Sequence, residues 1–376
     1  MLTKQAIIDE ALRLGFEDVG FTTAELFDSH KRYLHEHAEE YAWAEEEGLN
    51  LLGGTDPKSL FPKAESIIVL LENYYRQSFP MPVVNHFGRC YLDDDRVTKD
   101  GLALKIKAFR GFLRENAIDS KVPFNLPHRL AAARAGLGTL GKNCLFYAGR
   151  VARGSSWVLP VTVLVDRAFK PDNPTIDMGC PDWCRSACVA ACPTHALKGG
   201  GRIDPRRCIS YLSYFGRGLT PLKLRVPMGL YVYGCDRCQL VCPRNAPWLA
   251  QELPVNPRVV TKAPDFDLVR LLRMDFDYFQ ARIWPHMFYM SARDMWRWRM
   301  NAARAMGNTL DQAYIQELEK AFPVEADERV QAMIAWALGR IGGNAAYLAL
   351  KKLTNPVSQI VTREIADAIE GCQSRK

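Results

Sequence analysis

Cysteine is the residue type in this sequence whose number and spacing point most directly to chemistry. Eight of the eleven cysteines lie between residues 180 and 242. They form two groups and one isolated position: Cys180, Cys184, Cys188 and Cys192, then Cys208, then Cys235, Cys238 and Cys242. In a reducing compartment, clustered thiols are usually metal ligands or redox groups and not disulfides. The scattered Cys90, Cys144 and Cys372 are expected to be inert thiols.

The second group has the spacing C-x2-C-x3-C-P, which matches the last three cysteines of a bacterial ferredoxin run. In two-cluster ferredoxins, the cysteine before the proline binds the other cluster. We therefore predict two [4Fe-4S] clusters. The ligands of one are Cys180, Cys184, Cys188 and Cys242, and those of the other are Cys208, Cys235, Cys238 and Cys192.

The first group departs from the ferredoxin pattern, because all three of its spacings are x3. A slightly wider loop would absorb the extra residues, and which of its first three cysteines bind iron is left open. The alternative is a pair of structural zinc sites, whose ligands normally come as two separated C-x2-C pairs. The proline after each group favours iron-sulfur clusters.

The elements that position these cysteines begin with an α/β region, residues 1–175. We predict strands at 64–75 and 155–166, the second with Pro160 at an edge or a bulge. Helices are predicted at 100–116 and 127–136. The following stretch, "AGLGTLGKNC", is rich in glycine. Glycine lets backbone approach a ligand closely, but the stretch does not follow a strand as a dinucleotide fingerprint does, so a flexible surface turn is the alternative.

After the α/β region we predict a cluster module at 176–250, then a linker and helical repeats at 251–376. Gly307, Gly339 and Gly371 recur every 32 residues. Helix-pair repeats of this kind usually offer a concave surface to a partner, and a lid over the clusters is the alternative. Residues 292–307 carry four arginines and two tryptophans. Such a helix suits phosphates and unstacked bases, or it is a helix anchored by its tryptophans.

Bulk composition adds weak constraints. The 376 residues carry a formal net charge of +7, which permits an anionic partner without requiring one. No run of about 18 uncharged apolar residues is present, so no membrane span is expected. The amphipathic N-terminal stretch lacks the apolar core of a signal peptide. We therefore expect a cytoplasmic monomer.

Several stretches together resemble one family, namely "DPKSLFPKAESIIVLLENYY", "AGLGTLGKNC", "RCISYL", "YGCDRCQLVCPRN" and "AWALGRIG". The sequence resembles the epoxyqueuosine reductases, cobalamin-dependent iron-sulfur enzymes that complete queuosine in tRNA and are related to the reductive dehalogenases. The resemblance implies an α+β multidomain protein. Its parts would be a nitroreductase-like domain holding base-off cobalamin, a two-cluster ferredoxin module that reduces the cobalamin, and HEAT-like repeats that help bind the anticodon stem-loop.

The resemblance also assigns residues to the corrin. These are Gly136, Gly138, Gly141, Lys142, Asn143, Ser156, Trp157 and Pro160. A low-potential electron donor is implied as a further partner.

The sequence departs from the family where substrate would bind. The family usually carries an aspartate proton donor shortly before the glycine loop, and here no carboxylate lies between Lys121 and Lys142. Candidates for the donor are Tyr75, Asn125, His128 and Tyr147, with Tyr74 beside them. For each, ordinary core packing is the alternative. Three functions therefore stay open: a tRNA-modifying reductase, a dehalogenase-like reductase of a small molecule, and an electron-transfer or corrinoid protein.

Overall fold

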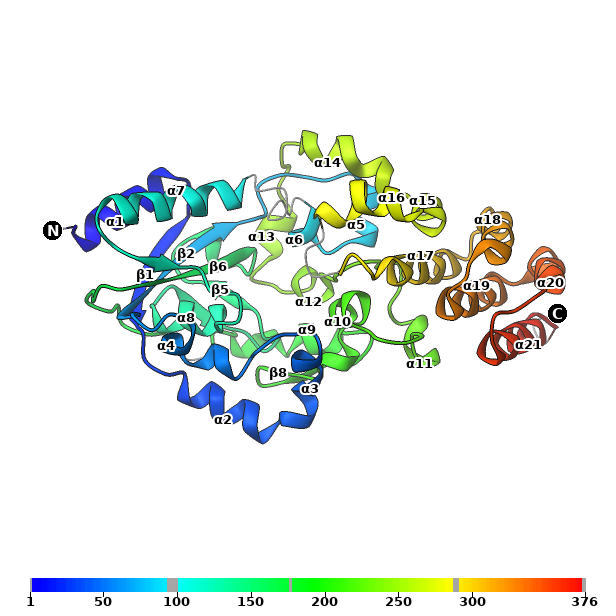
Figure 1. Ribbon diagram of the computed structural model, residues 1–376, viewed down its shortest axis with the longest axis horizontal. Coiled ribbons are helices and arrows are strands. Elements are labelled where there is room, and N and C mark those ends of the chain that lie inside the picture. Colours follow the sequence, from blue (N-terminus) through cyan, green and yellow to red (C-terminus); the bar gives the residue numbers. More distant parts are fainter. Residues whose placement is uncertain (1, 93–100, 176–177, 287–290, 374–376) are drawn as a thin grey trace. The chain divides into compact units, whose positions relative to one another are not determined.

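The computed structural model describes residues 2–92, 101–175, 178–286 and 291–373 (Figure 1). Helices and sheets are combined in an α+β chain that divides into two compact units. Unit 1 comprises Met1–Ser78, Lys99–Arg206 and Arg237–Pro254, and unit 2 comprises Phe79–Thr98, Arg207–Asp236 and Val255–Lys376. The chain therefore alternates between the units, and each unit is assembled from three separate segments. The three-part division into functional segments stays a prediction.

Unit 1 is built on a four-stranded sheet in the order β1-β2-β6-β3, with every neighbouring pair antiparallel. The strands are β1 (Asp18–Thr23), β2 (Ser66–Asn73), β3 (Ser120–Lys121) and β6 (Val158–Val165). Both β2 and β6 lie within the predicted strands. Pro160 pairs with Leu71 of β2, while β3 reaches only Leu164 and Val165. Pro160 thus has a strand on one side only, as its missing N–H requires.

Helices cover both faces of this sheet (Figure 1). On one face, α1 (Lys4–Arg13) packs through Ile7 in the same hydrophobic cluster as Ile68 and Leu70 of β2. The helix α7 (Leu102–Glu115) joins this cluster through Phe109 and Leu113. On the other face, the alanines of α8 (His128–Arg134) pack against Ile67 and other residues of β2. Successive β2 side chains point to opposite faces, which explains why this strand is buried almost throughout.

The glycine loop folds into a hairpin of β4 (Gly138–Leu140) and β5 (Phe146–Ala148). A Cβ at Gly138 would lie 2.0 Å from the backbone oxygen of Tyr147, and one at Gly141 would lie 2.5 Å from the Tyr147 ring. Both glycines are therefore required by the hairpin's own packing. Since both are buried, the loop is not a flexible surface turn. Gly136, with φ +70°, ends α8 as predicted.

The other elements of unit 1 are short. Its remaining helices are α2 (Asp28–Glu36), α3 (Ala38–Glu46), α4 (Pro57–Leu60), α9 (Ala187–Ala190), α12 (Arg237–Leu240) and α13 (Ala246–Leu249). A second hairpin pairs β7 (Leu197–Gly199) with β8 (Arg202–Ile203).

Unit 2 is helical in its described residues. The helices before the repeats are α5 (Met81–His86), α6 (Arg89–Leu92), α10 (Ile209–Tyr214), α11 (Leu222–Arg225), α14 (Pro257–Lys262), α15 (Leu268–Arg273) and α16 (Phe276–Tyr278). The repeat helices are α17 (Met295–Thr309), α18 (Tyr314–Ala321), α19 (Glu328–Ile341), α20 (Gly343–Lys352) and α21 (Gln359–Gln373).

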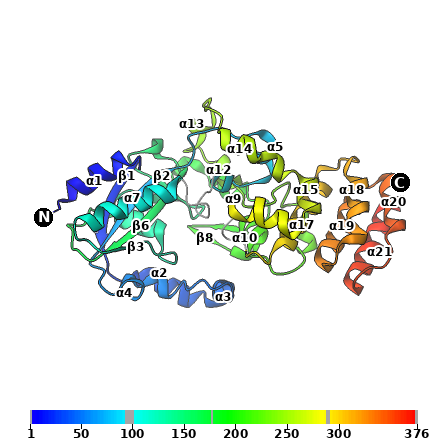
Figure 2. The same cartoon turned by 45° about the horizontal axis from the view of Figure 1, so that its top comes forward.

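The helical repeat predicted from the glycines is present. Figure 2 shows α17, α19 and α21 in succession. A Cβ at Gly307 of α17 would lie 2.8 Å from the Ala337 Cα of α19, and a Cβ at Gly339 would lie 2.9 Å from the Ala368 Cα of α21. The recurring glycines therefore allow successive helices to pack closely.

The arginines and tryptophans of α17 are largely internal. Arg297, Trp298 and Arg304 have exposed fractions of 3%, 0% and 0%. Trp298 stacks on Tyr233 with ring centroids 5.2 Å apart. These residues anchor the helix, so they do not form the phosphate-binding face that the sequence offered as one interpretation.

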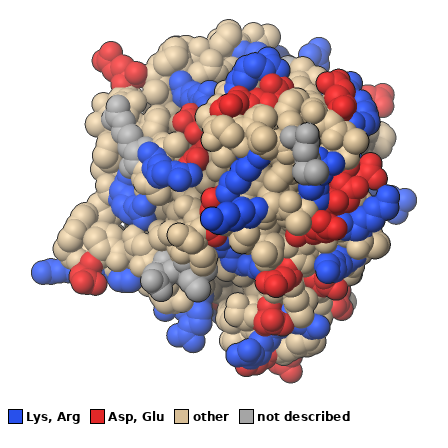
Figure 3. All heavy atoms as spheres, turned by 90° about the vertical axis from the view of Figure 1, so that its left-hand side faces the viewer, with Lys and Arg blue, Asp and Glu red and all other residues tan. Residues whose placement is uncertain are grey.

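Basic side chains on the face of the molecule drawn in Figure 3 are interspersed with acidic ones. This distribution agrees with the modest net charge. Within the described ranges, no helix has both the length and the apolar composition needed to span a bilayer.

Candidate iron-sulfur centre

Cys188 of α9 belongs to the first predicted ligand set. Its side chain is buried, and burial is the main cause that raises the pKa of the thiol. Cys180 and Cys184, and more weakly Cys242, raise the pKa further through charge repulsion. The charges of these three cysteines therefore act on Cys188, and the assignment of the four cysteines to one cluster stays a prediction. In the described part of the chain, no three Cys, His, Asp or Glu side chains are grouped tightly enough to hold a single metal ion.

A left-handed turn follows the second cysteine of the wider first run. Arg185 and Ser186 have φ values of 47° and 60°, between Cys184 and the start of α9. This conformation costs about 1–2 kcal/mol per non-glycine residue. The turn ends one short helix and starts the next between Cys184 and Cys188, and which of the first three cysteines bind iron stays open.

The second predicted ligand set is divided between the units. Cys192 and Cys238 belong to unit 1, and Cys208 and Cys235 belong to unit 2. The Cys192 sulfur accepts a hydrogen bond from the Ala196 backbone N–H at 3.3 Å. No disulfide is formed among the described cysteines. The assignment of this set stays a prediction.

The glycine-loop hairpin donates hydrogen bonds to two cysteines of the first set. The Lys142 backbone N–H donates to the Cys180 Sγ at 3.2 Å, and the Tyr147 hydroxyl donates to the Cys242 Sγ at 3.1 Å. Asn143 Nδ2 donates to the Tyr147 oxygen at 3.0 Å, which leaves the hydroxyl proton for the sulfur. Burial, and then the bond to Cys242, raise the pKa of Tyr147, so the hydroxyl stays protonated. Hydrogen bonds to sulfur are one means of setting a cluster's potential.

Ser156, predicted to contact the corrin, is bonded to the second cysteine run. Its backbone N–H donates to Asn245 Oδ1 at 2.9 Å, and its hydroxyl accepts from Asn245 Nδ2 at 2.9 Å. Gln239 Nε2 donates to the Ser156 carbonyl at 3.1 Å. Sequence reasoning missed Gln239 and Asn245. The position of Asn245 directly after "CPR" was the available signal.

The other predicted corrin residues divide by burial. Gly138, Gly141, Asn143 and Trp157 are buried, whereas Gly136, Lys142 and Pro160 are partly exposed. The partly exposed members have the larger surface with which to contact a bound group. The buried members hold the hairpin and the start of β6 beneath them.

The predicted proton donors occupy different environments. His128 Nε2–H donates to the Phe124 carbonyl at 3.3 Å, and its Nδ1 lies 2.9 Å from the Thr162 hydroxyl, which donates to it. Burial lowers the pKa of His128 to about 4, so the ring is neutral at pH 7. The Asn125 backbone lies against Gly54, where a Cβ would meet its oxygen at 2.0 Å.

The two neighbouring tyrosines pack close to Trp157. The Tyr75 ring lies 4.6 Å from the Trp157 ring, measured between centroids. The Tyr74 oxygen accepts from Gln239 Nε2 at 2.8 Å.

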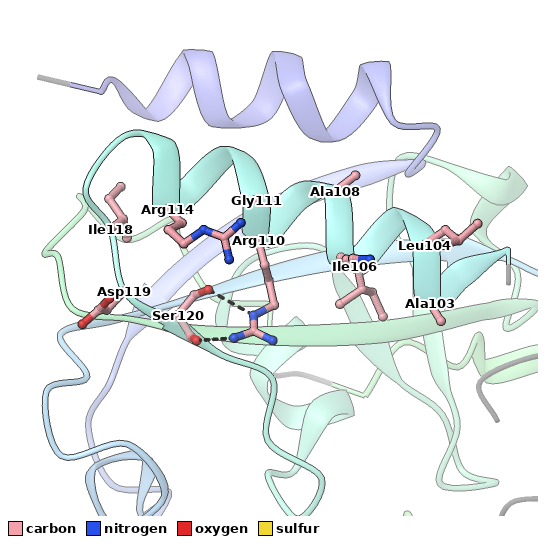
Figure 4. Close-up of a pocket in the computed structure, with 11 residues that line it drawn as sticks. Ala103, Leu104, Ile106, Ala108, Arg110, Gly111, Arg114, Ile118, Asp119 and Ser120 are labelled. Atoms are coloured by element: carbon pink, nitrogen blue, oxygen red, sulfur yellow. Dashed lines mark hydrogen bonds between the residues drawn. The ribbon is translucent and has the colours of Figure 1, made fainter. Parts of the chain in front are cut away.

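A groove of about 720 Å³ in unit 1 lies away from all these residues (Figure 4). It runs along α7, where Arg110 Nη2 donates to the Ser120 carbonyl at 2.9 Å. None of the predicted site residues lines this groove.

Comparisons with known proteins define the class first. The 4Fe-4S double cluster binding domain family matches residues 181–245, and the HEAT repeat family matches residues 290–370. The chain is therefore a two-cluster iron-sulfur protein with HEAT repeats.

Comparisons over the whole length are more specific. The chain is 32% identical to the epoxyqueuosine reductase of Staphylococcus aureus, over 91% of this chain and 90% of the relative. It is 30% identical to the enzyme of Pseudomonas aeruginosa, over 90% and 94%. A crystal structure of an epoxyqueuosine reductase with an epoxyqueuosine-modified tRNA-Tyr stem loop superposes with a TM-score of 0.82, at 27% identity and 98% coverage of both chains. The chain belongs to the epoxyqueuosine reductase family.

Proposed function

We propose that this protein reduces epoxyqueuosine in tRNA to queuosine. The observation that carries the proposal is the match of residues 181–245 to the 4Fe-4S double cluster binding domain family, in a chain whose relatives are epoxyqueuosine reductases. Removing the epoxide oxygen as water to leave an alkene takes two electrons and two protons. A [4Fe-4S] cluster passes one electron at a time, so two clusters in series suit the delivery of an electron pair.

We infer that the substrate is tRNA, bound by its anticodon stem-loop. A family member binds a modified tRNA-Tyr stem loop. The HEAT repeats present in this chain are the kind of extended surface that recognises such a partner. Binding should weaken steeply with salt, because phosphate contacts release counterions.

Cobalamin is the second cofactor that family membership implies. When bound, it would supply a strongly reducing and nucleophilic metal centre. The partly exposed Lys142 and Pro160 would contact it, and Asn143, Ser156 and Trp157 would hold the loop and strand below. The cysteines and their hydrogen-bond donors would set the potential at which electrons arrive.

We propose Tyr75 as the proton donor. Asparagine carries no acidic proton, so Asn125 cannot act as an acid. The Tyr147 proton is directed at a sulfur, and both ring nitrogens of His128 are hydrogen-bonded within the protein. Tyr75, like its neighbour Tyr74, carries a weakly acidic hydroxyl, which is the kind of group that a proton donor requires. In the Tyr75→Phe variant, turnover should be lost while iron content and tRNA binding are retained.

Conversion of an epoxyqueuosine-modified stem loop tests the function. Anaerobically reconstituted protein, cobalamin and a low-potential reductant should produce queuosine, measured by nucleoside analysis. The Cys188→Ala variant provides a matched inactive control. Failure of the wild type to convert the stem loop, with its clusters intact, would reject the proposal. The absence of a carboxylate before the glycine loop would then favour electron transfer without tRNA chemistry.

A further inference from the structure

Helix α17 carries a stripe of four polar residues that bond to one loop of unit 2. They recur at spacings of four, three and four, which places them on one side of the helix: Arg297, Asn301, Arg304 and Asn308. Between them they donate to backbone carbonyls of residues 213 to 232. This segment is the stretch of chain between Cys208 and Cys235.

The backbone carbonyls that the stripe binds lie at both ends of the loop and in its middle. Arg297 donates to Tyr214 and Gly216, near the first end. Arg304 donates to Gly229 at 2.6 Å and to Tyr231, and Asn308 donates at 2.8 Å to both Arg225 and Gly229.

Asn301 closes the loop at its base. Its single Nδ2 donates to the Ser213 carbonyl at 3.0 Å and to the Val232 carbonyl at 3.0 Å. The Ser213 hydroxyl in turn accepts from the Gly234 backbone N–H at 2.9 Å. Ser213 follows Cys208 by one helical turn, and Gly234 immediately precedes Cys235. One buried amide thus ties together the two ends of chain that carry these cysteines.

The loop's own hydrophobic cluster is small, although Val232 also packs in the larger hydrophobic cluster that includes α17. The hydrophobic cluster formed by α10 and α11 contains only Ile209, Leu212, Leu224 and Met228 as buried members among the described residues. Closing a loop of this length carries an entropic cost, and leaving a buried carbonyl unbonded carries a further one. The side chains of α17 offset both costs, since Asn301 and Arg304 are fully buried.

We propose that this stripe of α17 positions Cys208 and Cys235 as ligands of the second iron-sulfur cluster, with Asn301 as the central positioning residue. The inference rests on the ligand assignment within the proposed function. It gives the first repeat helix a task separate from tRNA binding, which is to hold the geometry of an electron-transfer centre.

Replacing Asn301 with leucine removes both donors while keeping a side chain of similar size. Gln331 of α19 offers a matched control. It is also buried, and its Nε2 donates to two backbone carbonyls, those of Phe322 and Glu325, which lie outside the loop. Gln331→Met should lower the melting temperature without changing the clusters. Full-length proteins are reconstituted anaerobically, and iron content and the EPR spectrum of the reduced state are recorded.

The wild type should contain about eight irons per chain, and Asn301→Leu about four, with loss of the magnetic interaction between two reduced clusters. Equal iron content and unchanged spectra in Asn301→Leu and Gln331→Met would overturn the inference. So would a wild type with about four irons, since the ligand assignment would then be wrong. These readouts need no tRNA, so they separate this inference from the proposed activity.

If Asn301→Leu does not fold, Ser213→Ala is the second variant. It removes the acceptor for the Gly234 N–H and the hydroxyl's own donation to the Ser210 carbonyl within α10. A changed potential or EPR signal of one cluster supports the inference, and wild-type values for both clusters would contradict it.

Discussion

Removing the Tyr147 hydroxyl should lower the reduction potential of one cluster. The hydroxyl lies 3.1 Å from the Cys242 sulfur in a buried setting, and Asn143 fixes its orientation. A reduced cluster is more negative, so its sulfur is the better acceptor and the bond favours reduction. Tyr147→Phe deletes the donor and keeps the ring, and the potential should therefore become more negative.

The size of the shift follows from the strength of one hydrogen bond. A bond of this kind contributes about 0.5–1.5 kcal/mol. For a one-electron couple, about 59 mV corresponds to a tenfold change, or roughly 1.4 kcal/mol. The expected shift is about 20–60 mV if most of the bond's contribution is gained on reduction.

Redox titration followed by EPR measures both clusters in one sample. One potential should move in Tyr147→Phe and the other should stay. Tyr278→Phe is the control, because the Tyr278 hydroxyl donates to Asp265 and not to a sulfur. An unchanged pair of potentials, or a shift to a more positive value, would refute the role of this hydrogen bond.

Three further outcomes are expected. Cys188→Ala should lose about four irons on reconstitution, whereas Cys372→Ala should keep the wild-type content, measured by iron analysis. Gly138→Ala should lower the melting temperature sharply, because its Cβ would lie 2.0 Å from a backbone oxygen, whereas Gly111→Ala in open space on α7 should stabilise by up to about 1 kcal/mol. Burial lowers the pKa of His128 from 6.5 in the unfolded chain to about 4 in the folded protein. Between these two pH values the unfolded chain binds a proton that the folded protein does not, so up to about 3 kcal/mol of folding stability is lost as the pH falls from 6.5 to about 4. The free energy of unfolding, measured by urea titration at several pH values, should change less steeply with pH in His128→Gln than in the wild type. Parallel curves for the two proteins would contradict this expectation.

Local patterns in the sequence were sufficient for much of the fold. The apolar run at 64–75 predicted β2, and the helical spacing of apolar residues at 100–116 predicted α7. Both patterns succeed because the spacing of apolar residues shows which sides of a strand or helix are buried. The glycine recurrence predicted stacked helices for the same reason, since Gly307 and Gly339 lie where two helices meet. The α+β organisation and the family were likewise confirmed.

Roles that depend on distant partners were not accessible to such patterns. Tyr147 was a candidate acid, yet its hydroxyl donates to Cys242, ninety-five residues away in sequence. Arg304 looked like a residue for phosphate, but the loop it bonds to lies more than seventy residues earlier. A side chain's type states which bonds it can make, while the fold decides which acceptor is close.

The alternation of the chain between its two units limits how this protein can change. Since each unit is assembled from three separate segments, no single cut in the gene yields either one whole. Recombination that exchanged only the repeat helices would also remove Asn301 and the neighbouring side chains of α17. These side chains bond to the loop between Cys208 and Cys235. We therefore expect sequences of this lineage to diverge by point substitutions that leave both units whole. The stretch between Lys121 and Lys142, which has no acidic residue, is an example of such local change.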